Sequence, residues 1–179
     1  MYGKIRGYLD HVLEGLVALA MGVLVVDVTW QVITRFVIRR PSSWTEELAT
    51  FLLIWVGLLG SAVALRRGAH LGIDFFVNRM KPRNRLITEL VVFSSVAAFS
   101  LTVLVGGGTE LVRTTLSTGQ VSPALRVQMG YVYLAVPVSG VFLALYSVES
   151  LIQRLARLLR GNFVEEVKVS LPGAVDPLN

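Results

Sequence analysis

Three long stretches of this chain contain no charged residue. They run from Leu48 to Leu65 (18 residues), from Leu90 to Thr109 (20 residues) and from Val127 to Val148 (22 residues). A helix needs about 20 apolar residues to cross the roughly 30 Å hydrocarbon core of a bilayer. A fourth stretch, Gly15 to Ile33, has this length and carries one charge, Asp27. The sequence therefore predicts an all-α integral membrane protein with four transmembrane helices, at about residues 12–35, 46–66, 87–110 and 127–149.

The basic residues are divided unequally between the two sides of the predicted membrane. Of the 17 lysines and arginines, 12 fall on the side of the termini and the middle loop. The other side has five: Arg35, Arg39, Arg40, Arg113 and Arg126. Because cytoplasmic loops carry the excess of basic residues, this division predicts that both termini are cytoplasmic. It also explains the basic isoelectric point without a nucleic-acid partner.

Amphipathic segments flank the predicted spans. In the middle loop, Ile73, Phe76, Val77 and Met80 recur with helical spacing, which is typical of a short helix lying in the membrane interface. Similar stripes precede the first span and follow the fourth. Such helices anchor the protein at the interface, or they bracket a second membrane protein. We expect residues 1–161 to form one membrane domain, and residues 162–179, which lack a sustained period, to form a flexible cytoplasmic tail.

Asp27 is the first candidate for chemistry, because a carboxylate inside a membrane is costly and suggests a functional site. It is either a proton or cation site, or a structural or protonated partner at a helix contact. The first span has no second aspartate and no asparagine beside Asp27, which makes it a poor carrier on its own. The alternative function is nevertheless an independent small proton-coupled carrier that acts as a homodimer through Asp27.

The remaining residue types argue against an enzyme. The chain has no cysteine, so it has no disulfide or cysteine-bound metal. Phosphate-binding loops, zinc-protease motifs and serine–histidine pairs in a span are also missing, and we expect no catalytic residue, no metal and no cofactor. Haem ligation by His11 or His70 is a third reading with little support, because both histidines lie near the predicted cytoplasmic ends.

The two ends of the second span carry the candidate polar clusters. Ser43 and Glu46 fit a capping box, Trp44 suits the headgroup layer, and Glu46 and Glu47 complement the helix dipole. The two acids could also form a cross-helix cluster with Arg35, Arg39 and Arg40. At the other end, the chain turns through Arg66, Arg67, His70 and Asp74. In the third span, the glycines at 106–108 favour close helix packing over local unwinding.

Three ordered segments carry a resemblance to a known family. They are Trp30–Val37, Trp44–Leu48 and Ala64–Asp74, with Ser122–Leu125 and Tyr133–Gly140 in support. They resemble the small membrane subunit of tripartite ATP-independent periplasmic (TRAP) transporters, the DctQ-like family. The resemblance covers about residues 10–150.

This resemblance implies a multi-pass protein of the bacterial inner (cytoplasmic) membrane that has two partners. A periplasmic binding protein would deliver an organic anion, expected to be a carboxylate such as a C4-dicarboxylate. A large TRAP membrane subunit would carry the anion inward by sodium symport. The chain itself would serve as the scaffold of the large subunit, with Arg35, Trp44, Glu46, Glu47, Arg66, Arg67, His70 and Asp74 as candidates for partner contacts or structural clusters.

Overall fold

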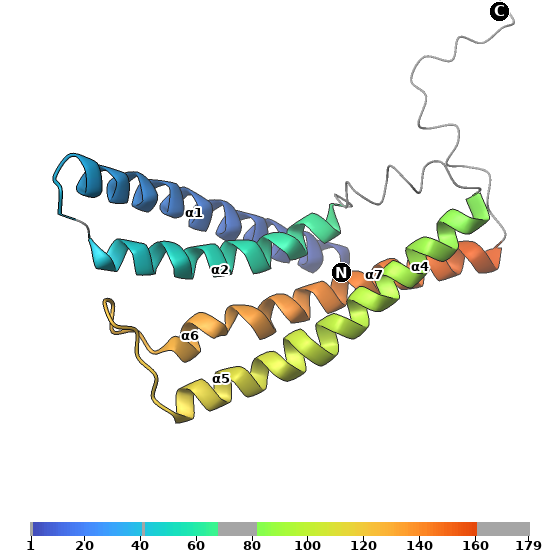
Figure 1. Cartoon of the computed structure of the whole chain (residues 1–179). Helices are drawn as coiled ribbons and strands as arrows, with labels where there is room; N and C mark the ends of the chain where they lie inside the picture. The colour runs from blue at the N-terminus through green and yellow to red at the C-terminus, as the bar shows by residue number, and fades with distance from the viewer. Residues whose placement is uncertain (1, 41, 68–81, 161–179) are drawn as a thin grey trace, which may run out of the picture.

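The computed structural model describes residues 2–40, 42–67 and 82–160, and these ranges are built from helices (Figure 1). The first two helices form one antiparallel pair, and the third and fourth helical segments form a second pair. The first pair is α1 (Tyr2–Phe36) and α2 (Ser43–Arg66). The second pair comprises α4 (Pro82–Phe99), the π-helix η1 (Ser100–Gly107) and α5 (Gly108–Ser117), followed by α6 (Met129–Tyr133) and α7 (Ala135–Arg160).

Four of these helical segments are long and apolar enough to cross a membrane. Their bounds are Asp10–Phe36, Ser43–Arg66, Ile87–Ser117 and Met129–Ala156. The predicted all-helical fold with four spans is therefore confirmed. The stripes before the first span and after the fourth belong to α1 and α7 themselves. The interfacial helix predicted in the middle loop and the tail at 162–179 lie outside the described residues.

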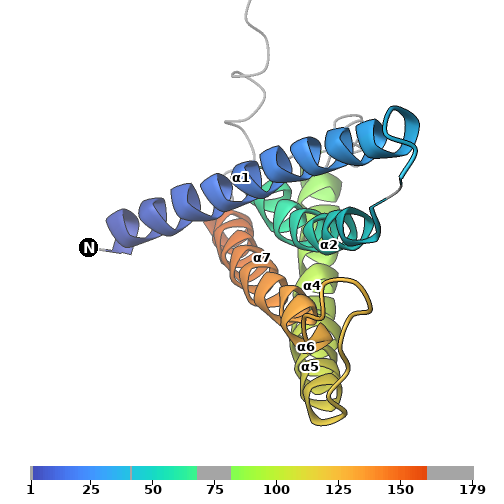
Figure 2. The ribbon, with the colours of Figure 1, turned by 90° about the vertical axis from the view of Figure 1, so that its left-hand side faces the viewer.

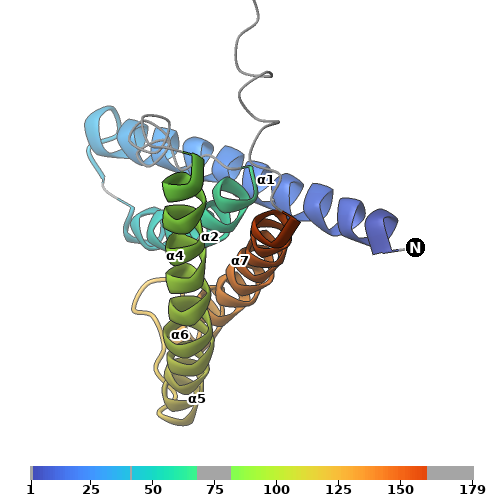
Figure 3. The same cartoon turned by 90° about the vertical axis from the view of Figure 1, so that its right-hand side faces the viewer.

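Helix α7 occupies the centre of the bundle, where it packs against α2, α4 and η1. Helix α1 lies on the outside and packs mainly along α2. In the two side views, α1 crosses above α2 and α7, and α5 lies at the edge of the bundle farthest from α1 (Figures 2 and 3). The apolar core gathers residues of α1, α2, α4 and α7: Leu13, Leu59, Ala62, Leu65, Phe93 and Tyr146. We call the end of the molecule with the α1 N-terminus and the α2 C-terminus the arginine end, and the opposite end, with the 37–42 and 118–128 connections, the hairpin end.

On the face of α1 that packs against α2, buried or half-buried residues recur at alternating intervals of four and three positions. They are Leu13, Val17, Ala20, Leu24, Asp27, Gln31 and Thr34. A repeat of 3.5 residues is the seam of a left-handed helix pair, which keeps one face of each helix against the other. The 35 residues of α1 would extend about 52 Å, more than the hydrocarbon core, so the helix must tilt in a bilayer.

Of the three glycines for which the sequence favours close helix packing, Gly108 lies at such a contact, and Gly140 of the fourth span lies at another. A Cβ atom added to Gly108 would lie 2.9 Å from Val136 Cγ1, and one added to Gly140 would lie 2.6 Å from Leu104 Cβ. Gly106 and Gly107 belong to η1, a widened turn of the helix rather than an unwound segment. The π-helix and the close contact with α7 therefore occur at the same level of the bundle.

The capping box predicted at the start of α2 is wrong in detail. The helix begins at Ser43, so the N-cap is Ser42 and not Ser43, and the Ser42 side chain makes no capping hydrogen bond. Thr45 instead donates its hydroxyl to the Ser42 carbonyl oxygen at 2.8 Å. The shift by one residue releases Glu46 from the capping position and leaves its side chain exposed.

Candidate functional site

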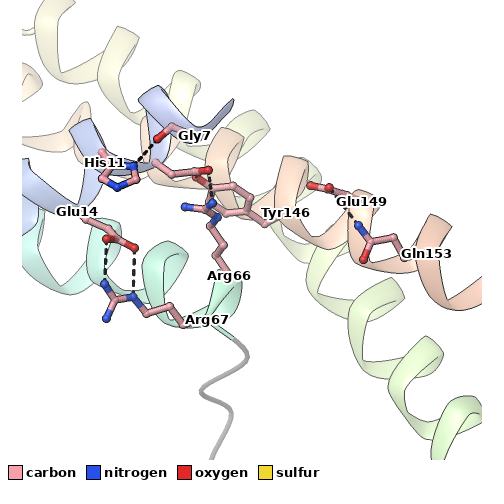
Figure 4. A network of polar contacts seen from close by, with 9 residues as sticks. Gly7, His11, Glu14, Arg66, Arg67, Tyr146, Glu149 and Gln153 are labelled. Carbon is pink, nitrogen blue, oxygen red and sulfur yellow. Dashed lines mark hydrogen bonds and ion pairs between the residues drawn. The ribbon is translucent and has the colours of Figure 1, made fainter. Parts of the chain in front are cut away.

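A buried polar contact joins three helices at the arginine end. Asp10 of α1 is 2% exposed and forms an ion pair with Arg66, the last residue of α2. Tyr146 of α7 donates its hydroxyl to the other Asp10 carboxylate oxygen at 2.7 Å (Figure 4). The Arg66 guanidinium also lies 5.9 Å from the centre of the Tyr146 ring. A buried charge is tolerated only when it is paired and hydrogen-bonded, and Asp10 meets both conditions.

A second ion pair lies one turn further along α1, on the surface. Arg67 contacts both carboxylate oxygens of Glu14, with its Nε 3.1 Å from Oε1 and a terminal nitrogen 2.9 Å from Oε2 (Figure 4). This two-point geometry suits arginine, whose planar group matches a carboxylate. The hydrogen bond to Glu14 raises the pKa of the Arg67 guanidinium, so this group stays charged. The adjacent arginines thus bind two acids of α1 spaced four residues apart.

A third ion pair connects α4 and α7 at the same end. Arg154 donates from Nε to Glu89 Oε2 at 2.7 Å, and its guanidinium lies 4.1 Å from the centre of the Phe93 ring. Stacking on an aromatic face adds to the attraction of the ion pair. The arginine end is therefore held by acid–arginine contacts between α1 and α2 and between α4 and α7, and Tyr146 connects the two pairs of helices.

At the hairpin end, one carboxylate holds the 118–128 loop. Oε2 of Glu47 accepts hydrogen bonds from the Ser122 hydroxyl at 3.1 Å, the Ala124 amide at 3.1 Å and the Leu125 amide at 2.6 Å. The loop is itself closed by the Ser122 amide, which donates to the Val127 carbonyl oxygen at 2.9 Å. Glu47 therefore holds the hairpin end of α2 against the connection between α5 and α6.

The cross-helix cluster proposed from the sequence takes a different form. Within residues 2–40, 42–67 and 82–160, no ion pair joins Glu46 or Glu47 to Arg35, Arg39 or Arg40. Glu46 is exposed, and it borders two hollows of about 360 and 310 Å³ beside α2. Trp44 is 45% exposed, as expected for a residue in the headgroup layer.

Asp27 lies buried in the α1–α2 seam, with 6% of its surface exposed. Its Oδ2 atom has no hydrogen-bond partner among the described residues. Around Asp27, the seam contains Leu24, Gln31 and Thr34. The described residues hold no cluster of three potential metal ligands around it or elsewhere. The geometry therefore places Asp27 at a helix contact, where a protonated carboxyl group is stable without a counter-ion.

The other predicted residues are placed as follows. Arg66 and Arg67 lie together in the cluster at the arginine end (Figure 4). Arg35 is exposed and lies in the last turn of α1, at the hairpin end. His70 and Asp74 lie outside the described residues. His11 is exposed and donates from Nδ1 to the Gly7 carbonyl oxygen at 2.6 Å.

The sequence did not indicate the partners of the arginines at the arginine end or of Glu47 at the hairpin end. These partners are Asp10, Glu14, Tyr146 and Ser122. A signal existed for two of them. Asp10 and Glu14 are acids four residues apart at the entrance to an apolar helix, and two adjacent arginines end the next helix. An antiparallel pair of helices brings such positions to the same end. Nothing in the sequence pattern distinguishes Tyr146 or Ser122.

Comparison with known proteins adds the family context. Residues 24–157 match the family model for the DctQ component of tripartite ATP-independent periplasmic transporters. The sialic acid TRAP transporter small permease protein SiaQ of Vibrio cholerae is 28% identical over 157 residues, which cover 88% of each chain. The C4-dicarboxylate TRAP transporter small permease protein DctQ of the same species is 28% identical over 105 residues, covering 59% of this chain and 45% of the relative.

A third relative is a much longer protein. The isethionate TRAP transporter permease protein DctMQ of Oleidesulfovibrio alaskensis is 28% identical over 155 residues. The match covers 82% of this chain but 24% of the relative. In that protein, a segment similar to this chain is covalently part of a larger permease.

Proposed function

This chain belongs to the DctQ component family of TRAP transporters, and we propose that it is the small permease subunit of such a transporter, bound to a separate large membrane subunit. The family match over residues 24–157 carries the proposal. The DctMQ relative supports it, because a segment that is fused to a larger permease in one protein is expected to bind one tightly in another.

In this role the chain is a scaffold rather than a carrier. Its polar contacts lie at the two ends of the bundle, and Asp27 is the one acid or base between them in the first span. The large subunit would carry an organic acid inward with sodium, after delivery by a periplasmic binding protein. The relatives named for sialic acid, C4-dicarboxylates and isethionate support an organic acid as the substrate class.

Co-purification tests this function. The tagged chain is expressed in its native inner membrane, extracted in mild detergent and analysed for stoichiometric partners. We expect one large membrane protein to be recovered in a one-to-one ratio. Recovery of a homo-oligomer alone, with solute flux in reconstituted vesicles, would contradict the scaffold role.

The burial of Asp27 without a hydrogen-bond partner for Oδ2 favours a second candidate, the independent proton-coupled carrier. This function requires a pH-dependent flux by the purified chain that is abolished in Asp27→Asn. Under the scaffold role, Asp27→Asn leaves co-purification and transport by the whole complex unchanged, since asparagine fits the same helix contact as a protonated aspartate.

A further inference from the structure

A hollow of about 310 Å³ lies along the α1–α2 pair near the hairpin end. Small-molecule sites have volumes of about 300–1,000 Å³, so the hollow can hold part of an amphipathic molecule. We call it the α1–α2 groove. Its lining comes from both helices: Leu24, Val28 and Gln31 of α1, and Glu46, Ala49 and Leu53 of α2.

One end of the groove is polar and lies near the predicted headgroup layer. Glu46 belongs to the first turn of α2 and follows Trp44, a residue type typical of that layer, by two positions. Gln31 of α1 lines the same groove. Neither the Glu46 carboxylate nor the Gln31 amide forms a hydrogen bond or ion pair with another side chain or backbone group among residues 2–40, 42–67 and 82–160. Both groups are therefore available to a ligand.

The other end of the groove is apolar and open to the membrane. Leu53 follows Glu46 by seven residues, which is about 10 Å along the helix axis. Leu53 is 61% exposed and Val28 is 40% exposed, so both offer apolar surface to an acyl chain. An acid at one end and apolar side chains about two turns deeper match the polarity of a phospholipid that lies along the helices.

A second hollow adjoins the groove and gives space for a headgroup. It has a volume of about 360 Å³, shares Glu46 and Thr50 with the groove, and is lined on its far side by Pro123 and Ala124 of the 118–128 loop. Glu47 also lines it, but the Glu47 carboxylate accepts three hydrogen bonds from that loop. Glu46 is therefore the acid of this pair that remains available for a cation.

We infer that the α1–α2 groove binds one phospholipid whose headgroup carries a primary amine, such as phosphatidylethanolamine. The ammonium group donates hydrogen bonds to the Glu46 carboxylate, the Gln31 amide donates to an ester carbonyl oxygen, and one acyl chain lies against Val28 and Leu53. This site goes beyond the proposed function and does not depend on it, because lipid surrounds the chain in either role.

The charge of Glu46 selects among the common phospholipids. A primary ammonium has N–H groups for charge-assisted hydrogen bonds to a carboxylate, whereas the quaternary ammonium of phosphatidylcholine has none. The anionic headgroup of phosphatidylglycerol is repelled by the carboxylate. An apolar helix of a partner protein would leave Glu46 and Gln31 without hydrogen bonds, which is costly once water is excluded.

Lipid titration of the full chain tests this site. The delipidated chain is titrated in mild detergent with phosphatidylethanolamine, phosphatidylcholine or phosphatidylglycerol, and native mass spectrometry measures the affinity for the first bound lipid. We expect the ethanolamine lipid to bind about tenfold more tightly than the choline lipid. E46Q should abolish this preference. The matched control is E110Q, because Glu110 is an exposed acid of α5 that lines neither hollow.

A second variant tests the apolar part of the groove without changing its charge. Ala49 lines the groove between Glu46 and Leu53, so the phenyl ring of A49F would fill the volume that the acyl chain occupies. We expect A49F to weaken the first binding event for the ethanolamine lipid. Binding of wild-type strength in A49F would contradict a lipid in this groove.

Four further results would overturn the lipid site. They are equal affinities of the wild type for the ethanolamine and choline lipids, an unchanged preference in E46Q, an equal loss in E110Q, and tightest binding of phosphatidylglycerol. The complex purified from the native membrane provides the last check. If the chain alone binds the ethanolamine lipid but the complex with the large subunit does not, a protein covers the groove in the membrane and the lipid is not its occupant.

Discussion

Asp10 is the residue whose surroundings matter most for stability, because it is a carboxylate with 2% exposure in an otherwise apolar contact of three helices. Removing Arg66 would leave this charge buried without its counter-ion. For Arg66→Met we expect a loss of about 3–5 kcal/mol in the free energy of unfolding, measured by denaturant titration in detergent micelles.

Two further variants distinguish the contribution of the Asp10–Arg66 ion pair to stability from the contributions of the neighbouring contacts. Tyr146→Phe removes one hydrogen bond to a charged group and should cost about 1.5–3 kcal/mol. Arg67→Met breaks the exposed pair with Glu14 and should change stability little, since such pairs are screened by water. Equal destabilisation by Arg66→Met and Arg67→Met would contradict the special role of the buried pair.

A second prediction for a single residue concerns Glu47, which accepts hydrogen bonds from the 118–128 loop. In Glu47→Ala, the Ala124 and Leu125 amides lose their acceptor, so they should exchange with deuterium faster than in the wild type. The loop is partly exposed, so the expected loss of stability is about 1 kcal/mol. Glu46→Ala is the matched control, because the exposed Glu46 side chain forms no hydrogen bond or ion pair with the loop residues that the structure describes. An unchanged exchange rate at both amides in Glu47→Ala would mean that the 118–128 loop keeps its conformation without the hydrogen bonds to Glu47.

At the scale of residues, the sequence did not predict which acidic side chain binds another part of the chain. The side chains of Glu46 and Glu47 are chemically alike, yet Glu47 binds the 118–128 loop and Glu46 is exposed. The difference arises from the rotation of α2 and from a loop 75 residues further along the chain. Neither is encoded in local periodicity. For Trp44, by contrast, the expectation depends only on its own amphipathic side chain, and its placement in the headgroup layer stays a prediction.

At the scale of elements, the spans could be predicted because their signal is local. A charge-free stretch of membrane length must become a helix in lipid, where every backbone group needs an internal hydrogen bond. The ends were less predictable: α1 begins at Tyr2 and α5 continues to Ser117, because polar residues at the interface extend a helix without showing an apolar pattern. The π-helix at Ser100–Gly107 had no clear signal beyond its glycines.

Close packing between η1 and α7 leads to a prediction for that pair of elements. In Gly140→Ala, the new Cβ would approach Leu104 Cβ to 2.6 Å and the Val105 amide nitrogen to 3.1 Å. The helices must then separate, which should cost about 1–3 kcal/mol in unfolding free energy. Gly57→Ala is the control, because a Cβ there meets nothing within 4 Å. A stability of Gly140→Ala equal to that of Gly57→Ala would show that α7 is not tightly packed against η1.

For the whole molecule, the remaining question is which end faces the cytoplasm. Four spans put both termini on one side, and the division of basic residues, 12 against five, predicts that this side is the cytoplasm. We expect green fluorescent protein fused after Asn179 to fluoresce, and alkaline phosphatase inserted after the exposed Gly119 to be active. The control insertion, after the exposed Arg67, should give inactive phosphatase, since Arg67 lies at the arginine end.

The same experiment bears on the three exposed arginines in the connections of the hairpin end. In the predicted orientation, Arg39, Arg40 and Arg126 face the periplasm. If phosphatase were active after Arg67 and inactive after Gly119, these three arginines would lie in the cytoplasm. They would then follow the ordinary excess of basic residues on that side. Orientation therefore decides whether the exposed arginines of the hairpin end are an exception that requires an explanation.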